Sequence, residues 1–373
     1  MDKPAEKLKV SILFWEEREQ GSPWHDEVVD QVEAALSEGG HKVSLIGIAS
    51  DVRELLDKLD DQRPELVFNL CERFADNDSL DMHVITLLDM LGQPFTGTGP
   101  LGTSLRQDKA ITKKLLQFHR VPYPDFITFD KHDIEFAGRM RFPLFVKPLS
   151  GDTSLGIDDA SLVTEYAKLI ERVDFIQTHL KVPALVEEFI EGREFYVSIL
   201  GNDPGEVLPL MELDFAKLPS GYPRIYGHDA KSDESSVQYG SVNAIVATDL
   251  TPETRARITM VGREAAYALK VRDYARVDIR LTADGRPVVL EVNANPYLES
   301  TSAFPLAALQ AGMGYTMLIN RIVEIALKRL EPTPFMKELQ KNRAGRSRIR
   351  RKTARLVEAQ ANQEAPATDN KDQ

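Results

Sequence analysis

The sequence predicts an α/β fold that begins with a doubly wound parallel sheet. Short apolar runs typical of β-strands alternate with segments of helical spacing along roughly the first hundred residues. Strands that alternate with helices form parallel sheets covered by helices. No Gly-x-Gly-x-x-Gly follows the first strand, so the dinucleotide-binding fingerprint is absent where it should occur. The strands are Lys9–Trp15, Lys42–Ile48 and Leu66–Leu70, and the helical segments are Asp26–Ser37 and Leu80–Leu91.

Size and composition narrow the class of protein. The chain has 373 residues and is 42% hydrophobic, enough for about two or three packed domains. Its formal net charge of −12 argues against a nucleic-acid partner, because phosphate binding needs an excess of Lys and Arg. No apolar run reaches the roughly 18–20 residues that span a bilayer, and the charged N-terminus does not resemble a secretory signal. A single cysteine, Cys71, cannot form an internal disulfide, so a reducing cytoplasm is the predicted location.

The turn at Gly97–Pro100 is the predicted end of the first region. After it, a helix over Thr103–His119 is ended by Val121-Pro122. A later helix over Thr251–Leu269 has Thr251 as its N-cap, and Asp284-Gly285 is typical of a β-hairpin turn. The other predicted strands are Phe142–Pro148, Pro183–Ile190, Glu194–Leu200, Val207–Leu213, Val242–Ala247, Ala275–Leu281 and Pro287–Asn295, and the other helices are Ala160–His179 and Tyr315–Leu330.

The C-terminal segment differs in composition from the rest of the chain. Residues 341–355 contain eight basic residues and no acidic one, and residues 358–373 are polar. We expect this tail to lie outside the folded core, as a disordered chain or a marginal helix. It could bind an acidic partner, although a solvated segment is the favoured interpretation.

Four polar side chains around the hairpin predict a magnesium site. Side chains on a strand alternate faces, so Arg276 and Asp278 point to one side, as do Glu291 and Asn293 on the next strand. Mg²⁺ prefers oxygen ligands, and arginine offers a fork of donors to an oxyanion. The alternative is a solvated hairpin face with cross-strand ion pairs. The valines that alternate with these residues instead indicate buried strands, where carboxylates need a partner such as a metal.

Two further segments suit a nucleotide. Lys147 ends an apolar strand directly before the Gly151–Gly156 loop, whose backbone N–H groups and hydroxyls can bind phosphate. From Glu187 to Phe195 the chain reads as a strand, a brief crossing and another strand. Such a hinge can present backbone groups to an adenine edge and a carboxylate to the ribose. Taken alone, each segment also fits a plainer interpretation, an ordinary strand-to-loop turn or an acidic surface hinge.

Several motifs follow one another in a specific order: Pro94-Phe-Thr-Gly97, Asp108-Lys109, Val146-Lys147-Pro148, the Gly151–Gly156 loop, Glu187 through Phe195, Arg276-Val-Asp278 and Glu291-Val-Asn293-Ala-Asn-Pro296. Over roughly residues 60–330 the sequence therefore resembles the ATP-grasp superfamily and, within it, the D-alanine–D-alanine ligase family. The resemblance implies an α/β ATP-grasp fold, in which a doubly wound parallel-sheet domain precedes two α+β lobes that enclose ATP. It divides the chain into an N-terminal domain (1–103), a central lobe with the phosphate loop (104–188), a C-terminal lobe with the metal site (189–332) and the tail (333–373).

The resemblance also implies roles for matching positions. The nucleotide contacts would be Lys109, Lys147, Thr153 and Ser154 at the phosphates, Glu187, Phe189 and Ile190 at the adenine, and Glu194 at the ribose. The metal ligands would be Asp278, Glu291 and Asn293, which would hold two Mg²⁺ ions, with Mn²⁺ as an alternative. Arg276 would stabilise the transferred phosphoryl group. Lys231 would reach the terminal phosphate from a mobile loop, or would be an ordinary solvated loop lysine.

The implied activity is ATP-dependent ligation of a carboxylate to an amine. The carboxylate would attack the γ-phosphate to give an acyl phosphate and ADP, and the amine would then displace phosphate to form an amide bond. The expected partners are small amino-acid or peptide-like substrates and, from the family's usual arrangement, a second copy in a homodimer. The alternatives are the D-alanine–D-alanine ligase of cell-wall synthesis itself and a non-catalytic ATP-binding regulatory protein.

The resemblance breaks at the substrate pocket. Family ligases continue Asn-x-x-Pro with Gly-Met-Thr, whereas this chain has Tyr297-Leu298-Glu299. Glu299 would repel a substrate carboxylate unless Ser300, Ser302 or Arg276 outweighs it. Ser232 follows Lys231 where the family's alanine ligases have tyrosine. The family's N-terminal His-Glu-Val-Ser signature is missing. Nearby candidates for its glutamate are Trp24, His25 and Glu27, although a surface turn that starts a helix is the favoured interpretation. Whether D-alanine is a substrate stays open at this point.

Overall fold

The computed structural model describes residues 7–18, 23–130, 134–137, 140–151, 156–227, 230–231 and 235–330. Three sheets form its framework, and the described residues up to Ala326 belong to one compact unit. The predictions for Thr153, Ser154 and the C-terminal tail lie outside the described residues. Within the described ranges, no helix has the length and apolar character needed to cross a membrane.

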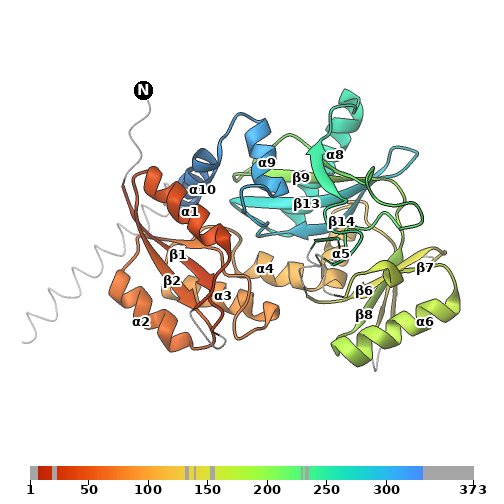
Figure 1. Cartoon of the computed structure of the whole chain (residues 1–373), viewed down its shortest axis with the longest axis horizontal. Helices are drawn as coiled ribbons and strands as arrows, with labels where there is room; N and C mark the ends of the chain where they lie inside the picture. The colour runs from red at the N-terminus through yellow and green to blue at the C-terminus, as the bar shows by residue number, and fades with distance from the viewer. Residues whose placement is uncertain are drawn as a thin grey trace, which may run out of the picture. The chain divides into compact units, whose positions relative to one another are not determined.

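The first sheet is parallel, as predicted, with the strand order β2-β1-β3. Helices α2 and α3 pack on one face, where Leu55 and Val84 join the buried cluster around Leu13. Val10 and Ile12 alternate with Leu13 and are fully buried too, so both faces of the sheet are covered. The elements are β1 (Lys9–Trp15), β2 (Lys42–Ile48), β3 (Leu66–Asn69), α1 (Glu27–Glu38), α2 (Val52–Gln62) and α3 (Asp81–Leu91) (Figure 1).

The second sheet is antiparallel, with the order β5-β4-β8-β6-β7. Helix α6 and the π turn that follows it cover one face, because Leu169, Val173 and Ile176 pack against the buried strand residues. Figure 1 shows α6 running along this lobe. The elements are β4 (Phe126–Phe129), β5 (Ile134–Ala137), β6 (Leu144–Pro148), β7 (Leu162–Val163), α6 (Tyr166–Phe175) and β8 (Ala184–Glu188).

The third sheet contains the predicted hairpin. Its order is β12-β11-β9-β13-β14, with β10 paired to β9. Helix α8 packs across this sheet through Ile258 and Ala265, and Gly262 permits the close approach. A Cβ at Gly262 would lie 2.7 Å from Cγ1 of Val197. The elements are β9 (Arg193–Leu200), β10 (Glu206–Val207), β11 (Met211–Asp214), β12 (Asn243–Val246), α8 (Pro252–Ala268), β13 (Tyr274–Leu281), β14 (Pro287–Asn293), α9 (Ala303–Gln310) and α10 (Tyr315–Leu330).

Two predicted elements are divided in the structure. The helix predicted over Thr103–His119 is two helices, α4 (Pro100–Gln107) and α5 (Lys109–Phe118). Asp108 between them is extended, and its carboxylate accepts hydrogen bonds from Ala110 N and Ile111 N, both at 2.9 Å. An aspartate that caps a helix in this way starts a new helix. The strand predicted over Val207–Leu213 is likewise two strands, β10 and β11.

Candidate active site

The hairpin of β13 and β14 brings the four predicted clamp residues together on one face. Arg276 lies opposite Asn293 and Asp278 lies opposite Glu291, with an irregularity in the pairing after Asp278. The Arg276 guanidinium donates two hydrogen bonds to the Asp278 carboxylate, from Nε to Oδ1 at 2.7 Å and from Nη2 to Oδ2 at 2.9 Å. Asn293 Nδ2 donates to the same carboxylate at 3.2 Å. We call Arg276, Asp278, Glu291 and Asn293 the clamp.

The clamp has two carboxylates and one guanidinium, so its net charge is negative and favours a cation. Asp278 is only 7% exposed, and burial raises the pKa of its carboxyl despite the neighbouring Arg276. Carboxylates directly opposite each other on paired strands repel, so Asp278 and Glu291 would be stabilised by a positive ion between them. Within the described residues no group of three or more His, Cys, Asp or Glu is placed to hold a metal. An ion here would therefore be held by two carboxylates, the Asn293 amide oxygen and oxygens of a ligand, a set that fits Mg²⁺.

A pocket extends from the clamp between the second and third sheets; we call it the nucleotide-sized pocket. It holds about 670 Å³ of empty space, open solvent included. The apolar part of its lining includes Phe145 and Phe189, whose rings lie 6.2 Å apart. The other apolar lining residues include Ile157, Ile190 and Leu290. We call the part of the lining formed by Lys147, Glu187, Lys231, Asp278 and Glu291 its polar end.

Lys147 belongs to a buried cluster of three charges. Its Nζ lies 2.8 Å from Oε1 of Glu187, and Nζ of Lys113 lies 2.9 Å from Oε2 of the same carboxylate. Burial alone would raise the pKa of Glu187, but the two ammonium groups outweigh it and hold the pKa at about 2. Lys113 was not among the predicted site residues. The signal was present, because Ala110, Lys113 and Leu116 share a helix face and place a lysine on the buried side of α5.

The predicted adenine segment is held by hydrogen bonds at both ends. Phe189 N donates to Pro143 O at 3.2 Å, so this donor is already engaged. Ile190 O accepts from Arg280 Nη1 at 2.9 Å, and a carbonyl retains a second lone pair for a ligand. Arg280 Nε also donates to Oε2 of Glu194 at 2.9 Å. Arg280 was missed from the sequence, although it continues the alternation of Arg276 and Asp278 on β13 by one more step.

The two remaining predicted lysines lie at different places around the pocket. Lys109 Nζ donates to Gly151 O at 2.6 Å, so it lies beside the start of the predicted phosphate loop. Lys231 lines the nucleotide-sized pocket, with its Nζ 4.9 Å from the centre of the Tyr226 ring. Burial and the nearby Arg276 lower the pKa of Lys231. The structure therefore brings Lys231 to the polar end, whereas Lys109 stays at the loop edge.

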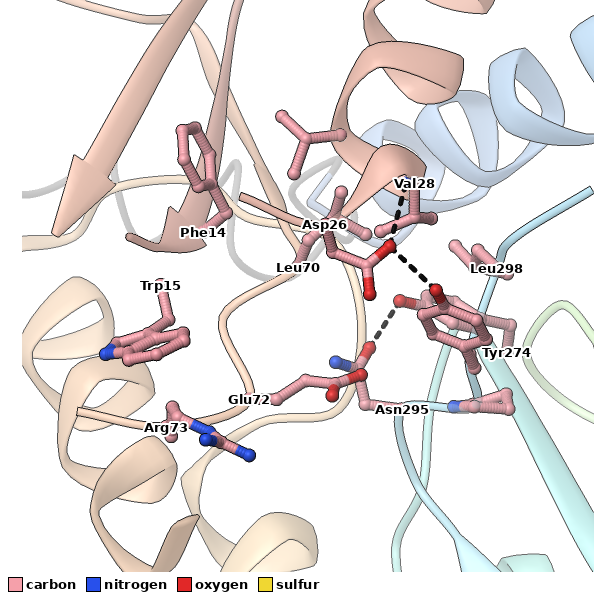
Figure 2. Close-up of a pocket in the computed structure, with 13 residues that line it drawn as sticks. Phe14, Trp15, Asp26, Val28, Leu70, Glu72, Arg73, Tyr274, Asn295 and Leu298 are labelled. Carbon is pink, nitrogen blue, oxygen red and sulfur yellow. Dashed lines mark hydrogen bonds between the residues drawn. The ribbon is translucent and has the colours of Figure 1, made fainter. Parts of the chain in front are cut away.

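A second pocket lies between the first sheet and the segment that follows β14. It holds about 530 Å³ of empty space, open solvent included. Figure 2 shows Glu72 reaching toward Asn295, with Trp15 and Arg73 on the opposite side. The Tyr297 hydroxyl donates to Asp26 Oδ1 at 2.7 Å and so joins the segment after β14 to the start of α1. None of Trp24, His25 and Glu27, the candidates for the missing glutamate, lines this pocket; Asp26 lies there instead.

One face of the hairpin connects the two pockets. Tyr274, Arg276 and Asp278 share a face of β13, and alternation makes Asn295, Asn293 and Glu291 the matching row beside it. Tyr274 and Asn295 are hydrogen-bonded to each other and line the second pocket, whereas Asp278 and Glu291 line the nucleotide-sized pocket. Arg276 and Asn293 therefore lie between a nucleotide-sized space and a second ligand-sized space.

The Glu299 carboxylate is held by the residues that follow it in the chain. Its carboxylate accepts hydrogen bonds from Thr301 N at 3.1 Å and Thr301 Oγ1 at 2.6 Å, and from Ser300 Oγ at 3.0 Å. These bonds outweigh burial and lower the pKa of the Glu299 carboxyl. Glu299 lines neither pocket, so the residue that replaces the family's glycine within the second pocket is Tyr297.

Two antiparallel sheets with a nucleotide-sized pocket between them define the ATP-grasp class of ATP-dependent ligases. Residues 115–324 match the family described as "D-ala D-ala ligase C-terminus". The chain belongs to the D-alanine–D-alanine ligase family, whose members are ATP-dependent carbon–nitrogen ligases.

Individual relatives and a solved structure are similar to most of the chain. The chain is 36% identical to the uncharacterised protein y4sG of Sinorhizobium fredii over 318 residues, 82% of this chain and 90% of the relative. It is 29% identical to the D-alanine–D-alanine ligase of Pelotomaculum thermopropionicum over 286 residues, 74% of this chain and 84% of the relative. In fold it is similar to the D-alanine–D-alanine ligase of Bacillus anthracis solved with ATP, with a TM-score of 0.65 at 24% identity, over 86% of this chain and 98% of that one.

Proposed function

We propose that this chain joins a carboxylate to an amine through an acyl phosphate, with ATP in the nucleotide-sized pocket and the substrates in the second pocket. The observation that carries the proposal is the clamp, because its Arg276 and Asn293 lie between the two pockets. Membership of a family of ATP-dependent ligases supports the amide-forming chemistry.

The proposed reaction has two steps. A carboxylate oxygen of the substrate attacks the γ-phosphorus, the bond to the β-phosphate oxygen breaks, and ADP leaves. The amine nitrogen then attacks the acyl carbon, the carbon–oxygen bond to phosphate breaks, and the nitrogen passes its proton to the leaving phosphate. Arg276 lies where charge develops in both steps, and its planar fork suits phosphoryl and carbonyl oxygens. Catalysis then consists mainly of positioning and electrostatic stabilisation.

Each ligand contact is proposed from its place around the pocket. Asp278, Glu291 and Asn293 would hold Mg²⁺ or Mn²⁺, which when bound neutralises phosphate charge. Other proposed contacts are Lys109, Lys147 and Lys231 at the phosphates, Phe145, Phe189 and Ile190 at the adenine, and Glu194 at the ribose. Glu187 lies between these regions and has its two oxygens directed at lysines.

The second pocket favours an amino-acid-like substrate that differs from D-alanine. Asp26, Glu72 and Arg73 line it and offer charges of both signs, which suits a molecule with an ammonium and a carboxylate. Tyr297 fills space that the family leaves to a glycine, so the shape available to the substrate is different. D-alanine–D-alanine ligation, the activity named for several relatives, is the second candidate.

A substrate panel tests the proposal. Purified chain with Mg²⁺ and ATP is mixed with pairs of D- and L-amino acids and dipeptides, and released phosphate, ADP and product masses are measured. We expect equimolar ADP, phosphate and amide from at least one acid–amine pair. Efficient dimerisation of D-alanine alone would favour the second candidate, and nucleotide binding without turnover on any pair would contradict the ligase proposal.

Two arginine variants, one in the clamp and one outside it, test the role of the clamp in the same assay. Arg276→Lys should lower kcat by about 100-fold or more, because a point charge cannot replace the fork at the transferred group. Arg321→Lys, at an exposed arginine on α10, is the matched control and should leave kcat unchanged. Equal kcat for both variants would remove Arg276 from the proposed chemistry.

A further inference from the structure

Three buried charges form a cluster at the polar end of the nucleotide-sized pocket. Lys113 comes from α5, Lys147 from the end of β6 and Glu187 from β8. Their exposed fractions are 2%, 6% and 3%, so none is an ordinary surface group. Burying an ion is costly unless its charge is compensated, and two cations share one carboxylate here. The cluster as a whole therefore retains one net positive charge.

The two lysines are not equivalent. Lys147 and Glu187 line the pocket, whereas Lys113 does not, so a ligand can touch Lys147 but not Lys113. The Lys113 ammonium lies 2.9 Å from Glu187 Oε2. Burial lowers the pKa of Lys113, and charge attraction to this carboxylate opposes that shift more than the hydrogen bond between the two groups does, so their link is chiefly one of charge. No step of the proposed reaction uses Lys113.

We infer that Lys113 is a positioning residue that neutralises Glu187 and so leaves the charge of Lys147 available to nucleotide phosphates. This inference rests on the proposed nucleotide site. Without Lys113, Lys147 and Glu187 would form a neutral ion pair, and the polar end of the pocket would lose its net charge from this cluster. The effect must then depend on the charge of the ligand. ATP and ADP should lose affinity, whereas adenosine, which has no phosphate, should not.

Calorimetric titration with ATP, ADP and adenosine in the presence of Mg²⁺ tests the inference. Lys113→Met should weaken ATP and ADP binding about tenfold, the order of magnitude expected for one charge at about 10 Å in a partly buried setting. Adenosine affinity should stay within about twofold, and Lys113→Arg should restore ATP affinity. Lys114→Met, at the exposed neighbouring lysine, is the matched control and should bind all three ligands as the unaltered chain does.

The double variant Lys113→Met, Glu187→Gln separates a charge effect from a structural one. It removes one positive and one negative charge, so the cluster again carries one net positive charge, and ATP affinity should recover relative to Lys113→Met. If Lys113→Met alone does not fold, the ATP affinity of the double variant is compared with that of the unaltered chain instead, and the two should be similar. Parallel losses for adenosine and ATP, or no recovery in the double variant, would overturn the inference. Absence of ATP binding by the unaltered chain would instead reject the nucleotide site itself.

Discussion

Glu187 shows what a single buried side chain contributes. Its carboxylate lies between the ammonium groups of Lys113 and Lys147, at 2.9 and 2.8 Å. These charges hold its pKa at about 2, below the ordinary value of 4.5. A group whose pKa is lowered by folding stabilises the protein above its ordinary pKa, and this contribution is lost as the pH falls toward the lowered value. The window for Glu187 is therefore from about pH 4.5 down to about pH 2.

The acid stability of the chain should depend on this residue. Between pH 4.5 and 2, the unaltered chain should lose on the order of 3 kcal/mol from Glu187, because each unit of pKa shift is worth about 1.4 kcal/mol. The Lys113→Met, Glu187→Gln variant lacks this carboxyl, so its free energy of unfolding should fall less over the same range. Urea unfolding at a series of pH values measures both. Glu264→Gln, at an exposed carboxyl on α8, is the control and should follow the unaltered chain. Identical pH dependence in all three proteins would contradict the assignment.

At the scale of elements, strand and helix periodicity each located several elements, and each merged two neighbouring elements into one. The residues of β1 and β2 agree with the predicted runs, because buried strands are short apolar segments bounded by polar turns. The helix break at Asp108 was missed because the residues on both sides have helical spacing, and only the capping side chain divides them. No element was predicted at α2, β4 or α9, where local sequence gives a weak signal and tertiary packing decides.

In the candidate site, too, local sequence patterns predict some residues, whereas others depend on tertiary contacts. The clamp could be predicted because alternation along a strand fixes which side chains share a face, and the register confirmed that the two faces coincide. Helical spacing places Lys113 on the buried side of α5, and alternation places Arg280 on the clamp face of β13, but neither pattern identifies their partners Glu187 and Glu194, which are far away in the sequence. The second pocket combines residues from the first sheet and from the segment after β14, and no sequence pattern records that proximity.

We propose that the three sheets correspond to the three domains, with boundaries near residues 103 and 188.

The crossing between β8 and β9 depends on Gly192. Its φ of +147° is one that other residues rarely adopt, and a Cβ there would lie 2.0 Å from Leu281 O at the end of β13. We therefore expect Gly192→Ala to lower the free energy of unfolding by about 3 kcal/mol or more. Gly314→Ala is the control, because a Cβ at Gly314 meets nothing within 4 Å. Urea unfolding monitored by circular dichroism compares the two; equal stability would mean that the backbone moves to accept the methyl group.

At the scale of the whole molecule, the first sheet and the segment after β14 are joined by specific polar contacts. Ser300 N donates to Gln31 Oε1 at 2.8 Å, and Asn320 Nδ2 donates to Ala35 O at 2.9 Å. Together with the bond from Tyr297 to Asp26, these contacts attach α1 to the C-terminal part of the compact unit. The second pocket lies at this junction, so its shape depends on residues that are about 270 positions apart, such as Asp26 and Tyr297.

Removal of the Tyr297 hydroxyl tests whether the contacts at this junction determine substrate binding in the second pocket. Tyr297→Phe removes the hydrogen bond to Asp26 but keeps the ring, and Asp26 can still cap α1 through Val28 N at 3.0 Å. We expect a modest loss of about 1 kcal/mol in the free energy of unfolding. The KM of the substrate bound in the second pocket should rise several-fold, because that pocket loses a fixed wall. The KM of ATP should not change, since Tyr297 does not line the nucleotide-sized pocket. Tyr166→Phe, at an exposed tyrosine on α6, is the control. Steady-state kinetics with each substrate varied in turn would show the difference, and an equal rise of both KM values would mean that the two pockets are not separate sites.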